Sequence, residues 1–465
     1  MEGHRYRSML RVLRPIVGED HVVVDPDVLA AHEADWTGAF VGSTSAVVRP
    51  ATTAEAAEVV WACRRDRIAL VPQGGNTGLV GGGVPLGGEV VLSTRRMTGI
   101  GDVDRDAGQL TAAAGETLAA VQSAALAAGW RYGVDLAARD SATIGGTVAT
   151  NAGGLRVLRH GTTRRQLLGV EAVLGTGDVV SRLGGLVKDG TGYDLAGLLC
   201  GSEGTLGVVT AVRLALVPAA GSSVTALVGL ASVADAVALV GHVRRSVPTL
   251  EAAELVLAAG ARLVADQTGA APVLDPALPV QVVLEAVGPP DPAAGLAAAL
   301  DAAVGVLDVA VAEDAGRAAA LWHVREAHTE AIARLGRPRK YDVTLPARRL
   351  ATFVEQVPGL VVAADPAAST WVFGHLGDGN VHVNVTGGTP RAPGTPDPVT
   401  DAVLGRVVAD GGSISAEHGI GTAKRAWLSR DRTAGDVAAM RAIKAALDPD
   451  GILNPAVLFP PDASG

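Results

Sequence analysis

The chain has 465 residues, of which 48% are hydrophobic and 19% are charged. This length allows two or three domains with cores of their own, and the composition excludes disorder over most of the chain. The net charge is −9 with acids and bases interspersed, so the sequence offers no basic stripe for nucleic acid and no polybasic segment for an anionic membrane.

The cysteine content and the apolar segments narrow the class of protein further. Only Cys63 and Cys200 are present, which excludes a disulfide framework and a four-cysteine zinc or iron–sulfur site. Residues 1–20 carry charges throughout, so they predict neither a secretory signal nor an anchor. The most apolar region, residues 224–240, is interrupted by Asp235 and predicts a strand and a helix rather than a membrane span. We therefore expect a cytoplasmic protein.

The first part of the chain alternates between helical and extended patterns. Residues 53–67 have helical spacing behind a threonine cap, and residues 68–71 predict a short buried strand that runs into a glycine cluster. A second helix is predicted within residues 116–129, where a glycine ends it. Two apolar runs in residues 167–180 flank a Gly-Thr-Gly-Asp turn and predict a hairpin.

A small-residue link at residues 219–223 predicts a domain boundary near residue 220. Beyond it, strand and helix patterns alternate, with strands at 224–230 and 280–286 and helices at 233–245 and 292–304. Residues 390–398 predict a surface loop, and helical periodicity returns at 434–447.

Three glycine-rich stretches indicate a cofactor that lies close to the backbone. Residues 72–78 (PQGGNTG) follow a predicted strand, and glycine lets such a loop direct successive N–H groups at a pyrophosphate; a plain surface turn is the alternative. Neither G-x-G-x-x-G nor the P-loop motif occurs, so a nucleotide must be held in another way. Residues 140–154 and 201–207 supply further hydroxyls and bare backbone. Together the three stretches favour a large planar cofactor.

A second group of residues has the chemistry of a metal site. His375 and His382 bracket the segment HLGDGNVH, and Glu417 and His418 open the segment EHGIG, in a chain with only ten histidines. Two histidines and one carboxylate suit a borderline divalent ion and leave a coordination position open for substrate. We therefore predict a metal on His375, His382 and Glu417, with zinc preferred and manganese or cobalt as alternatives. Each residue alone would read as a structural histidine or a surface acid.

Five long motifs in sequence order resemble the flavoproteins of the vanillyl-alcohol oxidase and p-cresol methylhydroxylase (PCMH) type, closest to their D-2-hydroxyglutarate dehydrogenase branch. They are PQGGNTGLVGG, IGGTVATNAGG, GYDLAGLLCGSEGTLGVVT, GHLGDGNVHVNV and EHGIGTAKR. The resemblance spans about His21 to Phe459. It implies an α+β fold with a PCMH-type two-subdomain FAD-binding domain at residues 1–219. It also implies a ferredoxin-like α+β cap domain with the substrate and metal sites at 220–420, and a small C-terminal helical segment at 421–465 that packs back on the FAD domain.

The resemblance also implies which residues surround the FAD. They are Pro72, Gly74, Gly75, Asn76, Thr77, Gly78, Asp135, Ser141, Thr143, Gly145, Gly146, Thr150, Asn151, Gly154, Glu203, Gly204, Val209 and Asn454. Relatives that bind flavin covalently often use a histidine in the first loop, where this chain has Asn76. We therefore expect a dissociable, non-covalent FAD.

Oxidation of a 2-hydroxy acid moves a hydride from C2 to flavin N5 while the hydroxyl loses its proton, and flavin supplies no base. We predict His418 as that base and as a substrate ligand, because histidine is close to half-protonated near neutrality. A metal would lower the hydroxyl pKa. Strand alternation puts His382 and Asn384 on one face, so we include Asn384 in the substrate site; a strand-edge amide is the alternative.

Three residues predict the length of the substrate. Arg325 and Thr329 are four apart on a predicted helix, where they would share a face, and Lys340 follows on a strand. Two cations suit a second carboxylate, and the trio resembles that of the D-2-hydroxyglutarate branch, whereas lactate and glycolate relatives tend to have a large aromatic side chain at the position of Thr329. His328 has no counterpart in that pattern, which leaves the exact diacid open. A solvated helix face with a surface ion pair is the alternative.

The sequence thus predicts an FAD-dependent, metal-assisted dehydrogenase for a D-2-hydroxy acid, with D-2-hydroxyglutarate as the first choice. Three alternatives remain open: a D-lactate or glycolate dehydrogenase, a non-redox transferase of the alkyl-glycerone-phosphate synthase type, and a flavin-binding subunit without activity of its own. The electron acceptor is not fixed by the sequence. Neither is the oligomeric state, for which a homodimer is one option.

Overall fold

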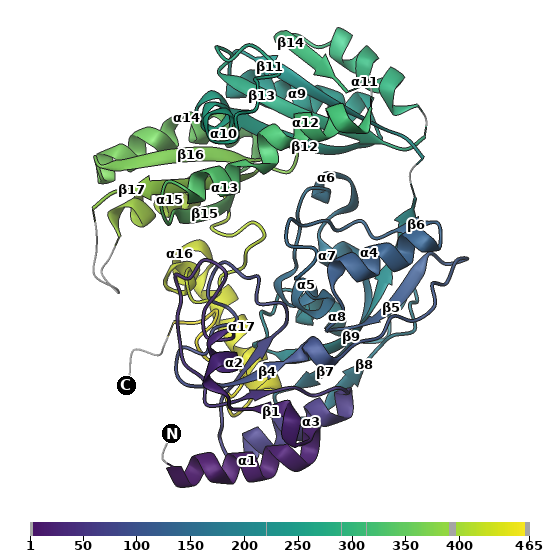
Figure 1. Cartoon of the computed structure of the whole chain (residues 1–465), viewed down its shortest axis with the longest axis vertical. Coiled ribbons are helices and arrows are strands. Elements are labelled where there is room, and N and C mark those ends of the chain that lie inside the picture. Colours follow the sequence, from purple (N-terminus) through teal and green to yellow (C-terminus); the bar gives the residue numbers. More distant parts are fainter. Residues whose placement is uncertain (1–2, 220, 290, 313, 390–396, 461–465) are drawn as a thin grey trace. The chain divides into compact units, whose positions relative to one another are not determined.

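The computed structural model describes residues 3–219, 221–289, 291–312, 314–389 and 397–460 (Figure 1). The chain divides into two compact units. Unit 1 contains residues 1–154, 161–219 and 417–465, and unit 2 contains residues 155–160 and 220–416. Unit 1 is therefore built from three separate stretches of chain, and the last of them follows unit 2.

Unit 1 is mixed helix and sheet. Its helices are α1 (Gly3–Val17), α2 (Pro26–Ala30), α3 (Thr53–Arg65), α4 (Leu118–Ala127), α5 (Ile144–Thr150), α7 (Thr163–Gln166), α8 (Leu195–Leu199), α16 (Leu428–Asp431) and α17 (Ala434–Leu447), with 3-10 turns η1 (Glu19–His21), η2 (Thr94–Arg96) and η3 (Arg425–Trp427). Its strands are β1 (Val22–Val23), β2 (Val47–Val48), β3 (Leu70–Gln73), β4 (Val90–Ser93), β5 (Gln109–Ala113), β6 (Trp130–Arg131), β7 (Leu167–Leu174), β8 (Val179–Ser181), β9 (Gly207–Ala215) and β10 (Val217–Pro218).

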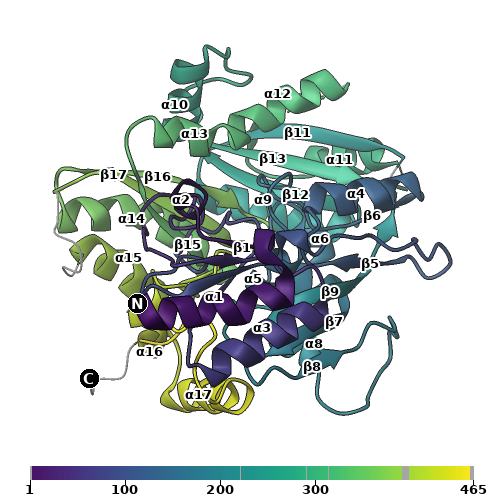
Figure 2. The ribbon, with the colours of Figure 1, turned by 60° about the horizontal axis from the view of Figure 1, so that its bottom comes forward.

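Two sheets form the frame of unit 1. One has the order β1-β2-β4-β3, with β2, β4 and β3 parallel, and the other has the antiparallel order β5-β9-β7-β8. Helix α1 packs along α3, and α3 packs against β7 (Figure 2). Among the described residues, each sheet contributes to a large buried apolar cluster, and the two large clusters share strands β7 and β9.

Helix α3 shows how local sequence sets an element. The Thr52 hydroxyl accepts the N–H of Glu55 at 3.1 Å and begins the helix. After the helix, Arg67 adopts a left-handed conformation with a φ of 53°. The N–H of Ile68 then donates to the carbonyl of Cys63, which satisfies a carbonyl at the C-terminal end of the helix. The predicted helix is confirmed, and the strand after it begins at Leu70 rather than at Ile68 because Ile68 belongs to the helix end.

Unit 2 is built on one seven-stranded antiparallel sheet with the order β14-β11-β13-β12-β16-β17-β15. The strands are β11 (Ser223–Leu230), β12 (Leu250–Leu257), β13 (Val280–Val287), β14 (Val306–Val311), β15 (Arg339–Thr344), β16 (Ala368–His375) and β17 (Asn380–Gly387). The helices are α6 (Val157–His160), α9 (Val233–Ser246), α10 (Ala258–Thr268), α11 (Pro292–Asp301), α12 (Ala315–Glu326), α13 (His328–Ala333), α14 (Ala347–Ala364) and α15 (Pro398–Ala409).

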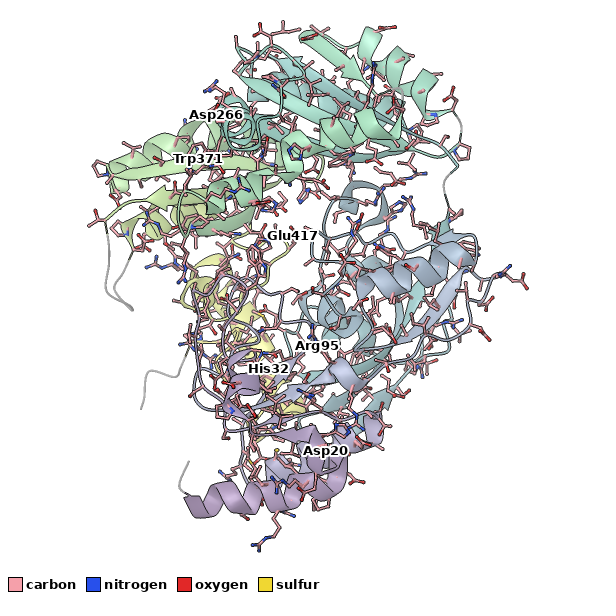
Figure 3. The ribbon with its side chains drawn as sticks, viewed as in Figure 1. Asp20, His32, Arg95, Asp266, Trp371 and Glu417 are labelled. Atoms are coloured by element: carbon pink, nitrogen blue, oxygen red, sulfur yellow. The ribbon has the colours of Figure 1, made fainter. Side chains whose placement is uncertain are left out.

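The register of four neighbouring strands gathers polar residues on one face of this sheet. Glu254 of β12 lies opposite His375 of β16, and Phe373 of β16 lies opposite His382 of β17. On β15, Asp342 lies opposite His382 and Lys340 lies opposite Asn384. Residues two apart on a strand point to the same side, so all of these side chains share one face, which we call the polar sheet face. Trp371 of β16 is labelled in Figure 3. Its indole N–H donates to the hydroxyl of Thr386 on β17 at 2.9 Å, which reinforces the register of these two strands.

Most of the predicted elements are confirmed. The hairpin is β7–β8, the helix predicted at 434–447 is α17, and the alternating elements after residue 220 are β11, α9, β13 and α11. Helix α5 was not predicted, since its sequence consists almost entirely of small residues. Of the predicted loop at 390–398, residues 390–396 lie outside the described residues, and Pro398 begins α15. Among the described residues, none of the helices is both long and apolar enough to cross a membrane.

Candidate functional site

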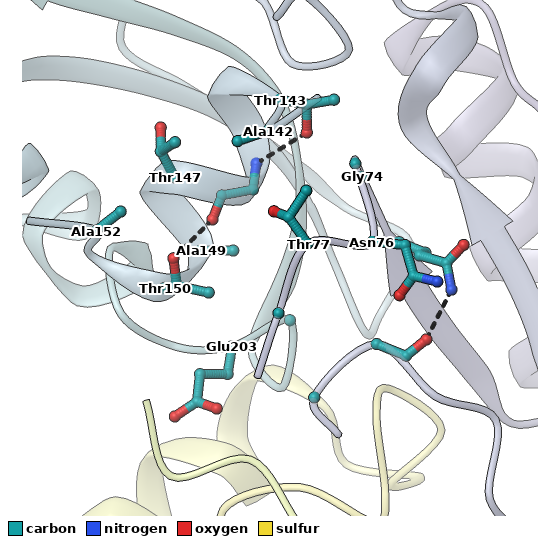
Figure 4. A pocket seen from close by; sticks show the side chains of 18 of the residues that line it. Gly74, Asn76, Thr77, Ala142, Thr143, Thr147, Ala149, Thr150, Ala152 and Glu203 are labelled. Carbon is teal, nitrogen blue, oxygen red and sulfur yellow. Dashed lines mark hydrogen bonds between the residues drawn. The ribbon is translucent and has the colours of Figure 1, made fainter. Parts of the chain in front are cut away.

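Unit 1 contains a cavity of about 320 Å³ whose wall comes from all three glycine-rich stretches. The loop after β3, the N-terminal turn of α5 and the turn at Glu203–Gly204 face one another across it (Figure 4). Glu417 and His418 also line it, so the two residues that begin the last stretch of unit 1 lie at the same cavity.

The loop of residues 74–78 is shaped for an anion. A Cβ atom on Gly74 would lie 2.1 Å from Thr143 Oγ1, and one on Gly75 would lie 2.0 Å from the carbonyl oxygen of Ser141, so only glycine fits at either position. In the described part of the chain, the backbone N–H groups of residues 76–78 have no protein acceptor. Successive free N–H groups in a glycine loop are a preformed anion site.

Helix α5 supplies the facing wall. The Thr143 hydroxyl caps the helix by accepting the N–H of Gly146 at 3.3 Å, and the Thr150 hydroxyl donates to the carbonyl of Gly146 at 3.0 Å (Figure 4). Gly145 cannot carry a side chain, because a Cβ there would lie 2.6 Å from that of Ala114. The wall therefore consists of backbone and small side chains, which allow a flat ligand to approach closely.

Glu203 and Asn454 tie the C-terminal stretch of unit 1 to this cavity. The Glu203 carboxylate accepts the N–H groups of Ile420 at 2.8 Å and Gly421 at 2.7 Å. Burial raises the pKa of Glu203, and these two N–H groups and Lys424 partly offset the rise. Asn454 donates to the carbonyls of Gly82 and Glu203, both at 2.8 Å, and its buried Oδ1 has no partner in the described structure.

Most of the predicted cofactor residues line the cavity. Those that do are Pro72, Gly74, Gly75, Asn76, Thr77, Gly78, Thr143, Gly145, Gly146, Thr150, Glu203, Gly204 and Val209. The other five are not among the lining residues. Ser141 is exposed, Asp135 forms a bridge with Gly154, Asn151 caps α5 in a left-handed conformation, and Asn454 donates to the carbonyls of Gly82 and Glu203. Asn76 turns its amide away, donating to the carbonyl of Ala34 at 2.8 Å.

Glu417 and His418 are held within unit 1. Glu417 Oε2 accepts the N–H of Gly154 at 2.7 Å, and its Oε1 lies 3.8 Å from His418 Nε2. Both side chains are about four-fifths buried, with 18% exposure each. His418 therefore stands at the cofactor cavity, where a base acting beside a flavin would have to be.

The polar sheet face of unit 2 carries the two predicted metal-ligand histidines. The rings of His375 and His382 lie 5.2 Å apart, edge to face. His375 Nδ1 lies 2.8 Å from Glu254 Oε1, and His382 Nδ1 lies 3.5 Å from Asp342 Oδ1. Each histidine thus has a buried carboxylate at one ring nitrogen, which is the arrangement that orients metal-bound imidazoles. His382 and Asn384 do share a face, as predicted.

Arg325 of α12 packs against the polar sheet face and is not a surface residue. It is 6% exposed, its Nε donates to Glu254 Oε2 at 2.8 Å, and its guanidinium lies 4.6 Å from the centre of the Phe373 ring. Burial of Glu254 by itself would raise the pKa of its carboxyl, but His375 and Arg325 outweigh this effect and lower it. The alternative of a solvated helix face with a surface ion pair is therefore wrong for Arg325.

The prediction that Arg325 and Thr329 share one helix face is also wrong. Helix α12 ends at Glu326 and α13 begins at His328, with Ala327 between them. Across this break Thr329 is exposed, and His328, only 1% exposed, takes the inner position with its ring 5.0 Å from that of Phe373. The structure also adds Glu254 and Asp342 to the site. Asp342 could have been predicted, because it lies two residues after Lys340 on the strand RKYDVT and so shares its face. No motif in the sequence around Glu254 indicates a site residue.

Known proteins match the chain over nearly its whole length. Residues 44–182 match the family model of an FAD binding domain, and residues 220–458 match that of the C-terminal domain of FAD linked oxidases. The chain belongs to the FAD-linked oxidases. The predicted resemblance and the α+β fold class are confirmed, and FAD is the cofactor that the free N–H groups and glycine walls of unit 1 fit.

Two relatives of this family show how far the match extends. The mitochondrial D-2-hydroxyglutarate dehydrogenase of Bos taurus is 38% identical over 462 residues, which is 95% of this chain and 82% of the relative. The D-2-hydroxyglutarate dehydrogenase of Xanthomonas citri pv. viticola is 38% identical over 443 residues, covering 94% and 93%. The solved 4-ethylphenol oxidase from Gulosibacter chungangensis superposes with a TM-score of 0.76 over 99% of this chain and 98% of its own, at 16% identity, which supports the fold alone.

Replacing Glu203 by Gln tests its role at the FAD cavity. Glutamine keeps one acceptor, so one of the N–H groups of Ile420 and Gly421 loses its partner, at a cost of about 1–3 kcal/mol. We expect a lower melting temperature and weaker FAD binding, measured by flavin fluorescence during titration of the apoprotein. Glu55→Gln is the control, because Glu55 also accepts a backbone N–H, from Ala51 at 2.8 Å, but does not line the cavity. Equal FAD affinity in Glu203→Gln and wild type would contradict this role.

His328 predicts a pH dependence of stability. Burial, followed by the charge of Arg325, lowers the pKa of His328 from 6.5 to about 4; the carbonyls of Val324 and Arg325 offset this only in part, since neither ring nitrogen has a hydrogen bond of normal geometry in the described structure. Between these values the unfolded chain binds more protons than the folded one, so acidification destabilises the fold. From pH 7 to pH 5 this histidine alone removes about 2 kcal/mol.

The apoprotein of His328→Leu should therefore lose less melting temperature between pH 7 and pH 5 than wild type does, as measured by calorimetry. The other histidines contribute equally to both proteins, so the difference isolates His328. Parallel losses in the two proteins would show that His328 is not buried in the neutral form.

Proposed function

We propose that this FAD-linked oxidase is a metal-assisted dehydrogenase that oxidises a D-2-hydroxy acid, most specifically D-2-hydroxyglutarate, to the 2-oxo acid. The observation that carries this proposal is the polar sheet face, which combines two histidines with a buried arginine. The names of the two relatives, each 38% identical over at least 94% of this chain, support the same substrate. Unit 1 would hold the FAD without a covalent bond, since Asn76 offers no nucleophile at the first loop.

In this proposal the functional domains follow the sequence as FAD-binding residues 1–219, substrate and metal residues 220–420, and a C-terminal segment at 421–465. Glu203 and Asn454 support the association of that last segment with the FAD cavity, because both bond across the stretches of unit 1. Cys63 and Cys200 are buried free thiols, which supports a reducing, cytoplasmic setting.

We propose His375, His382 and Glu417 as the ligands of a divalent ion, with zinc the first choice and manganese or cobalt the alternatives. An ionised carboxylate only accepts, so its contact with Glu254 places the proton of His375 on Nδ1 and makes Nε2 the ring atom that would coordinate a metal. The position of Ala416, the residue before Glu417, supports Glu417 as the third ligand. The N–H of Ala416 donates to Asp342 Oδ2 at 3.1 Å, and Asp342 lies next to His382.

The protein groups then divide the chemistry between them. His418 would take the hydroxyl proton, while Asn384 and Lys340 on the polar sheet face and Arg325 above it would hold the carboxylates. When bound, the flavin accepts the hydride from C2 at its N5 atom. A divalent ion held by His375, His382 and Glu417 would supply the Lewis-acid chemistry that lowers the pKa of the substrate hydroxyl. A distal carboxylate paired with Arg325 would favour a diacid.

Anaerobic reduction of the bound flavin tests the proposal. FAD-loaded protein is mixed with D-2-hydroxyglutarate, D-malate, D-lactate or glycolate, with and without a chelator, and flavin absorbance is followed. We expect fast bleaching by D-2-hydroxyglutarate, a large loss of rate after metal removal, and a rate about 10²-fold to 10⁴-fold lower in His418→Asn. Bleaching by the monoacids alone would contradict the assignment of a diacid substrate. No bleaching by any of the four acids would contradict the proposal that the protein is a dehydrogenase.

A further inference from the structure

Glu254 occupies a place in the core of unit 2 that packing alone does not explain. It lies in the apolar strand sequence Ala-Ala-Glu-Leu-Val-Leu of β12 and is 1% exposed. A buried ion pair gains little stability over apolar side chains of the same volume, because desolvation offsets the attraction. We therefore look for a role of the Glu254–Arg325 ion pair other than stabilising the fold.

The two oxygens of Glu254 bind two different groups. Oε1 accepts from His375 Nδ1 and Oε2 accepts from Arg325 Nε, both at 2.8 Å. His375 comes from the neighbouring strand β16, whereas Arg325 comes from the end of α12. One carboxylate thus joins a proposed metal ligand to the proposed anchor of the distal substrate carboxylate.

This bridging fixes the direction of both partners. With Nδ1 bound to Glu254, the imidazole of His375 can turn only its Nε2 to a metal. With Nε bound, Arg325 is held in one plane over Phe373, and within the described residues its two terminal nitrogens have no protein partner. A planar fork with both ends available is the geometry that binds a carboxylate in bidentate fashion.

We propose that Glu254 is a positioning residue that sets the separation between the metal-bound end of the substrate and its distal carboxylate, and thereby selects a diacid of one length. This inference rests on the proposed function. It adds a residue that need not touch substrate, cofactor or metal and acts through His375 and Arg325. Its loss should affect metal binding and substrate selection together, a combination that damage to either partner alone would not give.

The same strand provides a matched control. Glu251 is fully buried as well, and it pairs with two arginines and a histidine where Glu254 pairs with one of each: Arg156 at 2.7 Å, Arg159 at 2.9 Å and His160 at 3.0 Å. None of these partners belongs to the proposed site. Glu251→Gln therefore reproduces the loss of a buried, ion-paired carboxylate from β12 without changing His375 or Arg325.

The experiment compares wild type, Glu254→Gln, Glu254→Asp and Glu251→Gln as FAD-loaded proteins. Zn²⁺ affinity is measured by calorimetric titration after chelator treatment, and kcat and KM are measured for D-2-hydroxyglutarate and D-malate. We expect Glu254→Gln to bind Zn²⁺ about 10-fold to 100-fold more weakly. It should also lose most of its preference between the two diacids, chiefly through KM. Glu254→Asp keeps the charge, so it should recover part of the Zn²⁺ affinity while its shorter reach shifts the diacid preference.

The outcomes separate this inference from the proposed function. Zn²⁺ affinity and diacid preference in Glu254→Gln equal to those of Glu251→Gln would overturn the inference and leave the function intact. A change in only one of the two quantities would overturn the bridging role as well. Wild type that binds no Zn²⁺ and reacts with neither diacid would overturn the function and the inference together. Should Glu254→Gln not fold, the Asp variant decides by the same two measurements.

Discussion

The pairing register of β12, β16, β17 and β15 is the constraint on which the proposed metal and substrate site of unit 2 depends. Because side chains alternate along a strand, a slip of one residue would turn His375, His382 and their carboxylates from one face of the sheet to the other. The register is held over eight paired residues between β16 and β17 and over six between β15 and β17. The two histidines thus depend on backbone ladders for their position, and a rigid sheet is a more precise support for a site than a loop.

In unit 1 the constraint is the close approach of backbone to a flat ligand. Its cavity must bring backbone close to a large flat cofactor, so bulky side chains are excluded where the walls meet, and Gly74 and Gly75 leave no room for a Cβ atom. In the proposed FAD complex, the N–H groups left free by that loop would bind the pyrophosphate. Glu203 and Asn454 bind the last stretch of unit 1 to this wall. His418 therefore lines the cavity although it lies more than two hundred residues after Val209, the preceding lining residue outside that stretch.

Features written in short stretches of sequence were predictable. The threonine cap of α3, the hairpin β7–β8 and the shared face of His382 and Asn384 each depend on residues a few positions apart. Glu254 was out of reach, because its partner His375 lies 121 residues away and only the strand order joins them. The break at Ala327 was missed for another reason. Its backbone stays near helical values, and no glycine or proline marks the end of α12. His328, three residues after Arg325, takes the buried side instead of Thr329.

The central claim is that the histidines of the polar sheet face bind a divalent ion, and the metal's own coordination tests it most directly. X-ray absorption at the zinc edge of the FAD-loaded protein, reconstituted with one equivalent of Zn²⁺, reports the type and distance of each ligand. The account predicts two imidazole nitrogens at about 2.0–2.1 Å together with carboxylate or water oxygens at similar distance, and no sulfur. A spectrum without imidazole, or one with sulfur near 2.3 Å, would contradict it.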